Sequence, residues 1–154
     1  DFERFPGISK ARGSRLVAAG ELARRMKRIE RDKIESLQDI RSETSDMKLL
    51  EKEVLRVFYI SSGNEVLGRR DFQGAVSSVG LPDREILSEA LRKNSSALVI
   101  AHNHPSGKSE STEADRRATR DLMDSCRSLE IDLLDHVIVG EDLHSMRANS
   151  EGGF

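Results

Sequence analysis

Two histidines separated by one residue carry the clearest chemical signal in the sequence. His102 and His104 come directly after Ala97–Ala101, a run of apolar residues that predicts a strand buried on both faces. Because side chains two positions apart on a strand point to the same side, both imidazoles are expected to project together. Neutral imidazole is a common zinc ligand, so this pair predicts half of a metal site.

A carboxylate that follows the histidines can complete such a site. Asp115 comes after a loop containing Pro105 and Gly107 and falls in the first turn of a predicted helix. Two imidazoles and one carboxylate leave a fourth position on zinc open for water, as in hydrolytic zinc sites. Thr112 and Asp115 also have the spacing of a helix capping box, in which the carboxylate accepts backbone hydrogen bonds instead. Both interpretations stay open, and the histidine pair favours the metal.

The sequence around these residues resembles the RadC branch of the JAMM (MPN+) metalloprotease-like family, whose fold is also called the JAB domain. The resemblance rests on HNHPSG at 102–107, on Thr112 and Asp115 at the positions of the family's Ser-x-x-Asp, and on LDHVIVG at 134–140. It covers about residues 50–147. It implies an α/β sandwich of the MPN (JAB/JAMM, cytidine-deaminase-like) type, with a mixed β-sheet flanked by helices and preceded by an N-terminal helical segment.

The resemblance also implies a site and an activity. Zn²⁺ would be held by His102, His104 and Asp115, with water in the fourth position, and would serve amide or isopeptide hydrolysis in a protein or peptide substrate. Thr112 keeps the hydroxyl of the family's serine, which can hydrogen-bond a developing oxyanion. His136 is either an ordinary core histidine or a residue that supports the zinc ligands from behind.

The sequence departs from the family at the general base, which must take a proton from the attacking water. The family's catalytic glutamate is expected on the returning strand of the first hairpin, where this chain has Arg69 or Arg70. Arginine stays protonated and cannot accept a proton. Asp71 is therefore the predicted substitute, and Glu65 is a weaker candidate. Without a base, the chain would be a catalytically impaired zinc-binding or DNA-associated module.

Hydrophobic periodicity predicts the elements that must position these residues. Helices are expected over about residues 9–30, after the capping residue Ser36, and from Pro82 onward. Strands are expected at 54–61 and 66–72, which form a hairpin, and at 97–101 and 133–139. A further helix carries an apolar stripe of Ala114, Ala118, Leu122, Cys126 and Leu129. The end of the tail 141–154 is expected to be loose.

Composition limits the classes of protein to consider. The 154 residues fit one domain with a small appendage, and 25 basic against 27 acidic side chains give a net charge of −2. The single cysteine, Cys126, excludes an internal disulfide and a zinc site of several cysteines. No apolar run reaches the roughly 20 residues of a membrane-spanning helix, so no membrane partner is expected. No signal segment opens the sequence, which makes the cytoplasm the expected compartment.

Charge is distributed unevenly along the chain. Residues 1–33 hold ten Lys and Arg against five acidic residues, a net charge of +5, whereas the remainder carries −7. Residues 5–26 also resemble the end of the helix-hairpin-helix region that precedes a RadC domain. We therefore expect a helical segment at 1–35 and a RadC-like domain at 36–154. The basic residues expected to contact DNA phosphates are Arg24, Arg25, Lys27 and Arg28. A solvated helix face is the alternative, and the oligomeric state stays open.

Overall fold

The computed structural model describes residues 10–27, 32–74 and 80–154. The chain forms two compact units, 1–32 and 33–154, and each is described by itself. The first unit contains helix α1 (Lys10–Lys27), which confirms the helix predicted from its periodicity. Three of its apolar side chains are more than half exposed, namely Leu16, Val17 and Leu22. In the described part of α1, these side chains do not form a buried core.

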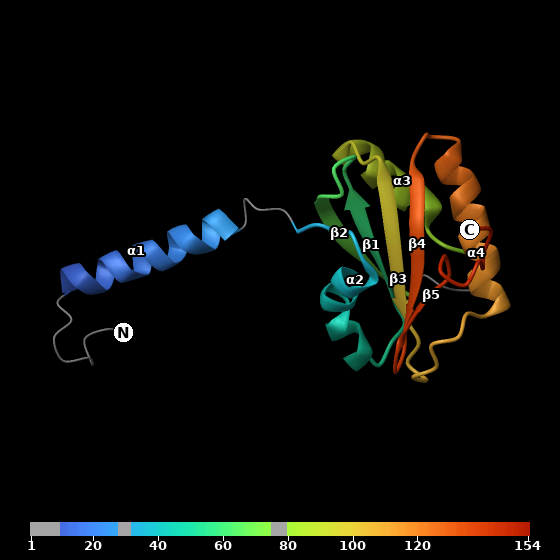
Figure 1. Cartoon of the computed structure of the whole chain (residues 1–154), viewed down its shortest axis with the longest axis horizontal. Coiled ribbons are helices and arrows are strands. Elements are labelled where there is room, and N and C mark those ends of the chain that lie inside the picture. Colours follow the sequence, from blue (N-terminus) through green and yellow to red (C-terminus); the bar gives the residue numbers. More distant parts are fainter. Residues whose placement is uncertain (1–9, 28–31, 75–79) are drawn as a thin grey trace. The chain divides into compact units, whose positions relative to one another are not determined.

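The second unit is built on one mixed five-stranded sheet with the order β2-β1-β3-β4-β5 (Figure 1). Its strands are β1 (Val54–Ile60), β2 (Val66–Gln73), β3 (Ala97–Asn103), β4 (Asp132–Val139) and β5 (Leu143–Ser145). Strands β3 and β4 are parallel, and the other neighbouring pairs are antiparallel. The hairpin, the buried strand and the mixed sheet are thus as predicted.

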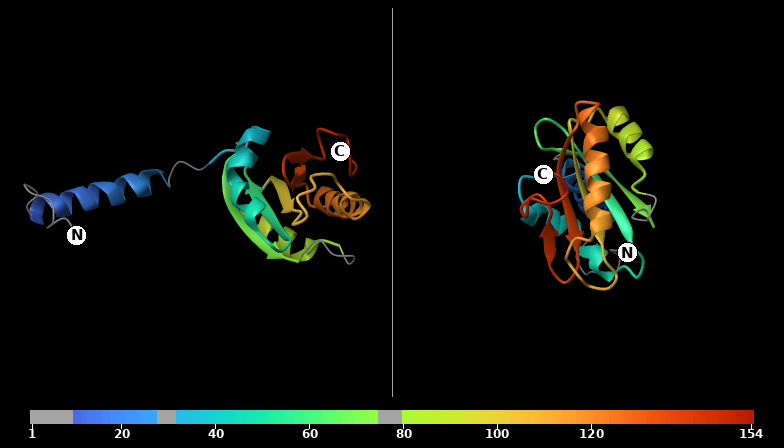
Figure 2. Two further views of the ribbon diagram at one scale, coloured as in Figure 1. Left: turned by 90° about the horizontal axis from the view of Figure 1, so that it is seen from below. Right: turned by 90° about the vertical axis from the view of Figure 1, so that its right-hand side faces the viewer.

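Helices cover both faces of this sheet (Figure 2). They are α2 (Leu37–Glu43), the 3₁₀ helix η2 (Ser45–Leu49), α3 (Asp83–Lys93) and α4 (Glu113–Arg127). Helices α3 and α4 pack on one face, where the buried residues include Leu55, Ile100 and Leu122. Helix α2 and η2 pack on the other face, around Phe58 and Val99. Both faces are covered, which explains why every residue of β1 and β3 is buried.

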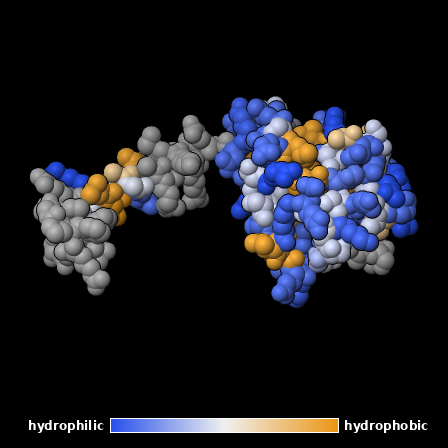
Figure 3. Space-filling model, turned by 60° about the horizontal axis from the view of Figure 1, so that its bottom comes forward, coloured by the Kyte–Doolittle hydropathy of each residue, from blue (hydrophilic) through white to orange (hydrophobic). Residues whose placement is uncertain are grey.

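One face of this unit is mostly polar. The face drawn in Figure 3 is largely hydrophilic, with small apolar patches between charged side chains. Among the residues that the structure describes, no helix is both long enough and apolar enough to cross a membrane.

Two predictions about the C-terminal half were wrong. Ala114 is exposed and Leu129 is 40% exposed, whereas the polar residues Asp115 and Thr119 are buried on the inner face of α4. Hydrogen bonds make this polar burial tolerable, as shown below. The tail is also not loose, because β5 extends the sheet, Met146 is fully buried and Phe154 packs against the core.

A buried arginine connects the sheet to the helices on the α2 face. Arg56, only 4% exposed, donates from Nε and a terminal nitrogen to both carboxylate oxygens of Asp71, each at 2.8 Å. It also donates to both oxygens of Asp46, at 2.7 and 2.9 Å, and to the carbonyl of Glu43 at 2.8 Å. These hydrogen bonds, the one with Asp71 foremost, raise the pKa of Arg56. Arg56 thereby joins η2, α2 and β2 to β1.

Replacing this side chain tests its contribution to stability. Arg56→Lys keeps the charge but cannot make the forked hydrogen bonds, so we expect the free energy of unfolding to fall by about 1–3 kcal/mol in urea. The control is Arg127→Lys, because Arg127 pairs with Asp124 on the exposed surface. Its effect should stay below about 0.5 kcal/mol. Equal effects of the two substitutions would contradict this assignment.

Candidate metal centre

The two histidines lie at the carboxyl end of β3, beside the parallel strand β4. His102 pairs with Leu55 of β1 and with Ile138 of β4, and its side chain is completely buried on the α4 face. The N–H of His104 donates to the carbonyl of Val139 at 3.1 Å, which continues the alignment one residue beyond the strand. Both imidazoles therefore lie on one side, with their Nε2 atoms only 2.8 Å apart.

A tight turn after His104 shapes this end of the sheet. Gly107 has φ +79°, a conformation that favours glycine, and its N–H donates to the carbonyl of His104 at 2.9 Å. A side chain at Gly140 would place its Cβ 2.5 Å from the carbonyl oxygen of Gly107. The loop after β3 and the turn after β4 can therefore approach this closely only with glycine at 140.

Asp115 reaches the histidines from the first turn of α4. Its Oδ1 lies 3.3 Å from Nε2 of His102, and its Oδ2 lies 3.6 Å from Nε2 of His104. Oδ2 also accepts hydrogen bonds from the N–H and the hydroxyl of Thr112, both at 2.7 Å. The capping box and the approach to the histidines therefore exist together. The cap holds the carboxylate in place while Oδ1 faces the imidazole.

The hydroxyl of Thr112 has a different partner from the one that we predicted. It has a single proton, and it donates that proton to Asp115. In this arrangement it has no proton left for an oxyanion. Thr112 therefore orients Asp115.

Hydrogen bonds behind the histidines determine which ring nitrogens carry protons. Nδ1 of His104 lies 2.9 Å from the carbonyl of Lys108, which can only accept, so Nδ1 carries a proton, and in the neutral ring that binds a metal Nε2 carries none. On the other side, Nδ1 of His102 lies 2.7 Å from Nε2 of His136, whose Nδ1 lies 2.6 Å from the hydroxyl of Thr119. The tautomer of His102 thus depends on Thr119.

Thr119 donates its hydroxyl proton to the carbonyl of Asp115 at 2.6 Å, one helical turn earlier. The hydroxyl oxygen then accepts from Nδ1 of His136, so Nε2 of His136 accepts in turn from Nδ1 of His102. If the Thr119 hydroxyl instead donated its proton to His136, its oxygen and the carbonyl oxygen of Asp115 would lie 2.6 Å apart with no proton between them. In the neutral ring, Nε2 of His102 therefore carries a lone pair. His136 has the supporting position predicted as one of its two alternatives.

Burial affects the charge of these groups. Burial lowers the pKa of His136 well below its ordinary value, and positive charge on His102 would lower it further, so His136 is neutral. Burial alone would raise the pKa of Asp115, but the hydrogen bond and charge attraction that His102 would supply if its ring were protonated, together with the hydrogen bonds from Thr112, outweigh it. The net pKa of Asp115 is well below its ordinary value, so this residue is a carboxylate.

These groups fit a zinc ion. Two imidazole lone pairs face each other at 2.8 Å and repel unless a cation lies between them, and a carboxylate oxygen faces the same point. Two donors of one tetrahedral zinc, with bonds of about 2.0–2.1 Å, lie roughly 3.3 Å apart. The distance from His102 to Asp115 matches this value, and the two imidazoles need to separate by only about half an ångström.

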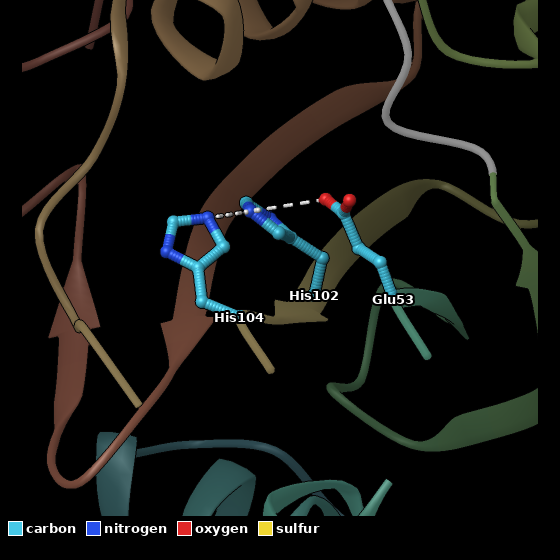
Figure 4. A group of neighbouring side chains, drawn as sticks. All are labelled: Glu53, His102 and His104. Atoms are coloured by element: carbon cyan, nitrogen blue, oxygen red, sulfur yellow. Dashed lines mark hydrogen bonds and ion pairs between the residues drawn. The ribbon is translucent and has the colours of Figure 1, made fainter. Parts of the chain in front are cut away.

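A second carboxylate, not predicted from the sequence, belongs to the same site. Oε1 of Glu53 lies 4.0 Å from Nε2 of His102, and the ligand atoms of Glu53, His102 and His104 all lie within 4.8 Å of one another (Figure 4). Glu53 immediately precedes β1, two positions before Leu55, the residue that pairs with His102. Alternation along β1 therefore turns Glu53 to the same face as the histidines.

The residues predicted to replace the family's base lie elsewhere. Asp71 pairs with Arg56, and this pair is in register with Ala101 on β3, so Asp71 lies on the face opposite to His102. Arg69 and Arg70 of the same edge strand pair with Glu43 and Glu85, respectively. Glu65 pairs with Lys33 in an isolated bridge next to the hairpin turn.

The predicted nucleic-acid contacts fall outside what the structure describes in detail. Arg24, Arg25 and Lys27 belong to α1, but the structure does not describe their side chains. Arg28 lies outside the described residues.

Comparison with known proteins identifies the family to which this chain is similar. Residues 34–152 match the family described as RadC-like JAB domain. UPF0758 proteins of Burkholderia cenocepacia HI2424 and Burkholderia orbicola MC0-3 are each 38% identical to the chain over 146 residues, which are 91% of this chain and 56% of the relative. A UPF0758 protein of Shewanella baltica OS185 is 33% identical over 143 residues, which are 90% of this chain and 64% of the relative. The chain thus spans less than two thirds of the length of these relatives.

The metal centre can be tested by zinc binding. We expect the chain to bind a single zinc ion, and His102→Ala and Asp115→Asn to lose it, because each removes a group expected to hold the metal. Elemental analysis after gel filtration measures the zinc content. Free zinc at 100 times its dissociation constant should raise the free energy of unfolding by about 2.7 kcal/mol.

His144→Ala serves as the control, since His144 pairs with Glu151 and not with this site. It should keep its zinc. A native chain that takes up no zinc after metal is added back would rule the centre out.

Proposed function

The chain belongs to the RadC-like JAB domain family, and on this basis we propose that it is a zinc-dependent hydrolase of amide or isopeptide bonds in a protein or peptide substrate. One observation carries the proposal. The Nε2 atoms of His102 and His104 and the Asp115 carboxylate converge on one point, and the carboxylate of Glu53 lies beside them.

The two carboxylates of the site receive different roles. Asp115 lies closer to His102 than Glu53 does, at 3.3 against 4.0 Å, so we assign the metal to His102, His104 and Asp115. Zinc bound there would lower the pKa of a water molecule to about 7 and polarise the substrate carbonyl. Glu53 remains available for proton transfer.

Glu53 is the base in this proposal, in place of Asp71. Its carboxylate accepts the proton of the attacking water at Oε1 and delivers it to the nitrogen of the departing amine. The side chain is 31% exposed, whereas His102 and Asp115 are almost fully buried, so Glu53 lies where substrate and solvent can reach it. This proposal makes the absence of a glutamate at Arg69 and Arg70 compatible with activity.

Substitution of the two candidate bases tests this assignment. Glu53→Gln should keep the zinc ion but lower kcat by about 10²–10⁴-fold, because an amide cannot accept the proton. Asp71→Asn should leave hydrolysis within about twofold, since its partner is Arg56 on the opposite face. Turnover is measured on a panel of short peptides and lysine isopeptides, with zinc content determined in parallel. If Asp71→Asn abolished turnover while Glu53→Gln kept it, Asp71 and not Glu53 would be the base. A native chain without turnover would correspond to the catalytically impaired alternative.

A second candidate function is DNA binding by the first unit, and the charge distribution favours it. Residues 1–33 carry a net charge of +5, and α1 is a separate helix with exposed apolar side chains in its described part. Phosphate contacts of this kind bind DNA without reading its sequence.

Salt dependence distinguishes DNA binding from a solvated helix face. Replacing Arg24, Arg25, Lys27 and Arg28 together by Gln should weaken binding to duplex DNA and reduce the slope of log K against log salt by up to about 3–4. Replacing four exposed arginines of the second unit serves as the control; they are Arg84, Arg92, Arg117 and Arg127. If the variant of the basic segment and the control variant bound duplex DNA equally strongly, this role for the basic segment would be excluded.

A further inference from the structure

The residue between the two histidines is buried and fully hydrogen-bonded. Asn103 is 1% exposed, and alternation along β3 turns it to the face opposite to His102. Its Oδ1 accepts the N–H of Val54 at 2.8 Å. Its Nδ2 donates to the carbonyl of Lys52 at 3.1 Å and to the carbonyl of Leu50 at 3.4 Å.

These three hydrogen bonds surround Glu53 along the backbone. One is made to the residue before Glu53 and another to the residue after it. Residues 51–53 belong to no helix or strand, because η2 ends at Leu49 and β1 begins at Val54. The backbone carbonyl of Glu53 accepts a hydrogen bond from the N–H of Gly74 at 3.0 Å. Asn103 therefore adds side-chain hydrogen bonds between the segment of Glu53 and the strand that carries the histidines, beyond the pairing of β1 with β3.

The chemistry of the amide suits this position. The partners are one group that only donates, the N–H of Val54, and two that only accept, the carbonyls of Lys52 and Leu50. Asparagine matches this set with one acceptor oxygen and two N–H groups. Aspartate would match only the first partner and would repel the two carbonyls, so its carboxylate cannot replace the amide here.

We propose that Asn103 is a positioning residue that sets the place of Glu53 relative to His102 and His104. This inference rests on the proposed function, in which Glu53 must reach a water bound beside the histidines. Asn103 is covalently joined to both histidines and hydrogen-bonded on both sides of Glu53, so it couples the base to the metal ligands. A displacement of about 1 Å at such a site can lower the rate about 10²-fold.

The experiment compares Asn103→Ala and Asn103→Asp in the full chain. Both variants should retain zinc, because neither loses a ligand, and kcat should fall about 10–100-fold. Amide exchange at Val54 should become faster in Asn103→Ala and should stay slow in Asn103→Asp, which keeps that acceptor. In a double-mutant cycle, Asn103→Ala should cause little further loss once Glu53 is already Gln, because the two residues act through one group.

The matched control is Asn149→Ala. Asn149 also donates from its amide to a backbone carbonyl, that of Ser145 at 2.8 Å, but it is exposed and lies outside this site. Its removal should leave zinc content, kcat and exchange at Val54 unchanged. If Asn103→Ala does not fold, the native protein still provides a test. Both Nδ2 protons of Asn103 should exchange slowly in NMR spectra, and fast exchange would overturn the proposal.

Two results would overturn the role of Asn103 while leaving the proposed function intact. One is full kcat in Asn103→Ala, and the other is an additive loss in the double-mutant cycle. Absence of turnover in the native chain would instead reject the proposed function. In that case Asn103 can be tested without turnover, in protein that carries cobalt(II) in place of zinc. The visible spectrum of cobalt reports changes around the metal, and Asn103→Ala should change it in the same way as Glu53→Gln. An unchanged spectrum in Asn103→Ala would then reject the positioning role.

Discussion

The Nε2 atoms of His102 and His104 face each other at 2.8 Å, with no proton between them when both rings are neutral, and the rest of the site depends on this constraint. The direction of each imidazole is set from behind, by the carbonyl of Lys108 for His104 and by His136 with Thr119 for His102. Such an arrangement is unfavourable by itself and becomes favourable around a cation. Helix α4 supplies both the carboxylate that faces the nitrogens and the hydroxyl that determines the tautomer, so the polar residues on its inner face belong to the site.

The sheet separates two polar clusters that have different purposes. On the α2 face, Arg56 uses its donors on Asp46, Asp71 and a backbone carbonyl, and this cluster connects structural elements. On the α4 face, the acceptors of His102, His104 and Asp115 converge without an internal donor between the two imidazole nitrogens. A saturated cluster stabilises a fold, whereas an excess of acceptors attracts a positive ion. This difference explains why Asp71 and Glu53, both carboxylates near β1, receive different roles.

Local patterns predicted most elements and the three proposed ligands. Apolar periodicity predicted the strands, and the spacing of His102 and His104 placed both imidazoles on one side. Glu53 was missed because only the pairing of β1 with β3 brings it to the histidines, and no local signal encodes that pairing. Leu134 packs on the α2 face although His136, two positions later, faces α4, because the register of β3 and β4 shifts after Leu98 and interrupts the period of two. Buried polar residues such as Thr119 interrupted the predicted apolar stripe of α4.

The order in which the site can assemble during folding follows from its topology. All three proposed ligands and His136 belong to β3, α4, β4 and the loops between them, so they come together through contacts that are short in sequence. Glu53 arrives with β1, and the hydrogen bond between Asn103 and Val54 closes a loop of 49 residues. Loop closure costs more entropy as the loop lengthens, and distant contacts form more slowly. On folding, the three proposed ligands can therefore come together before Glu53 reaches them, so the two parts of the site depend on contacts of different range.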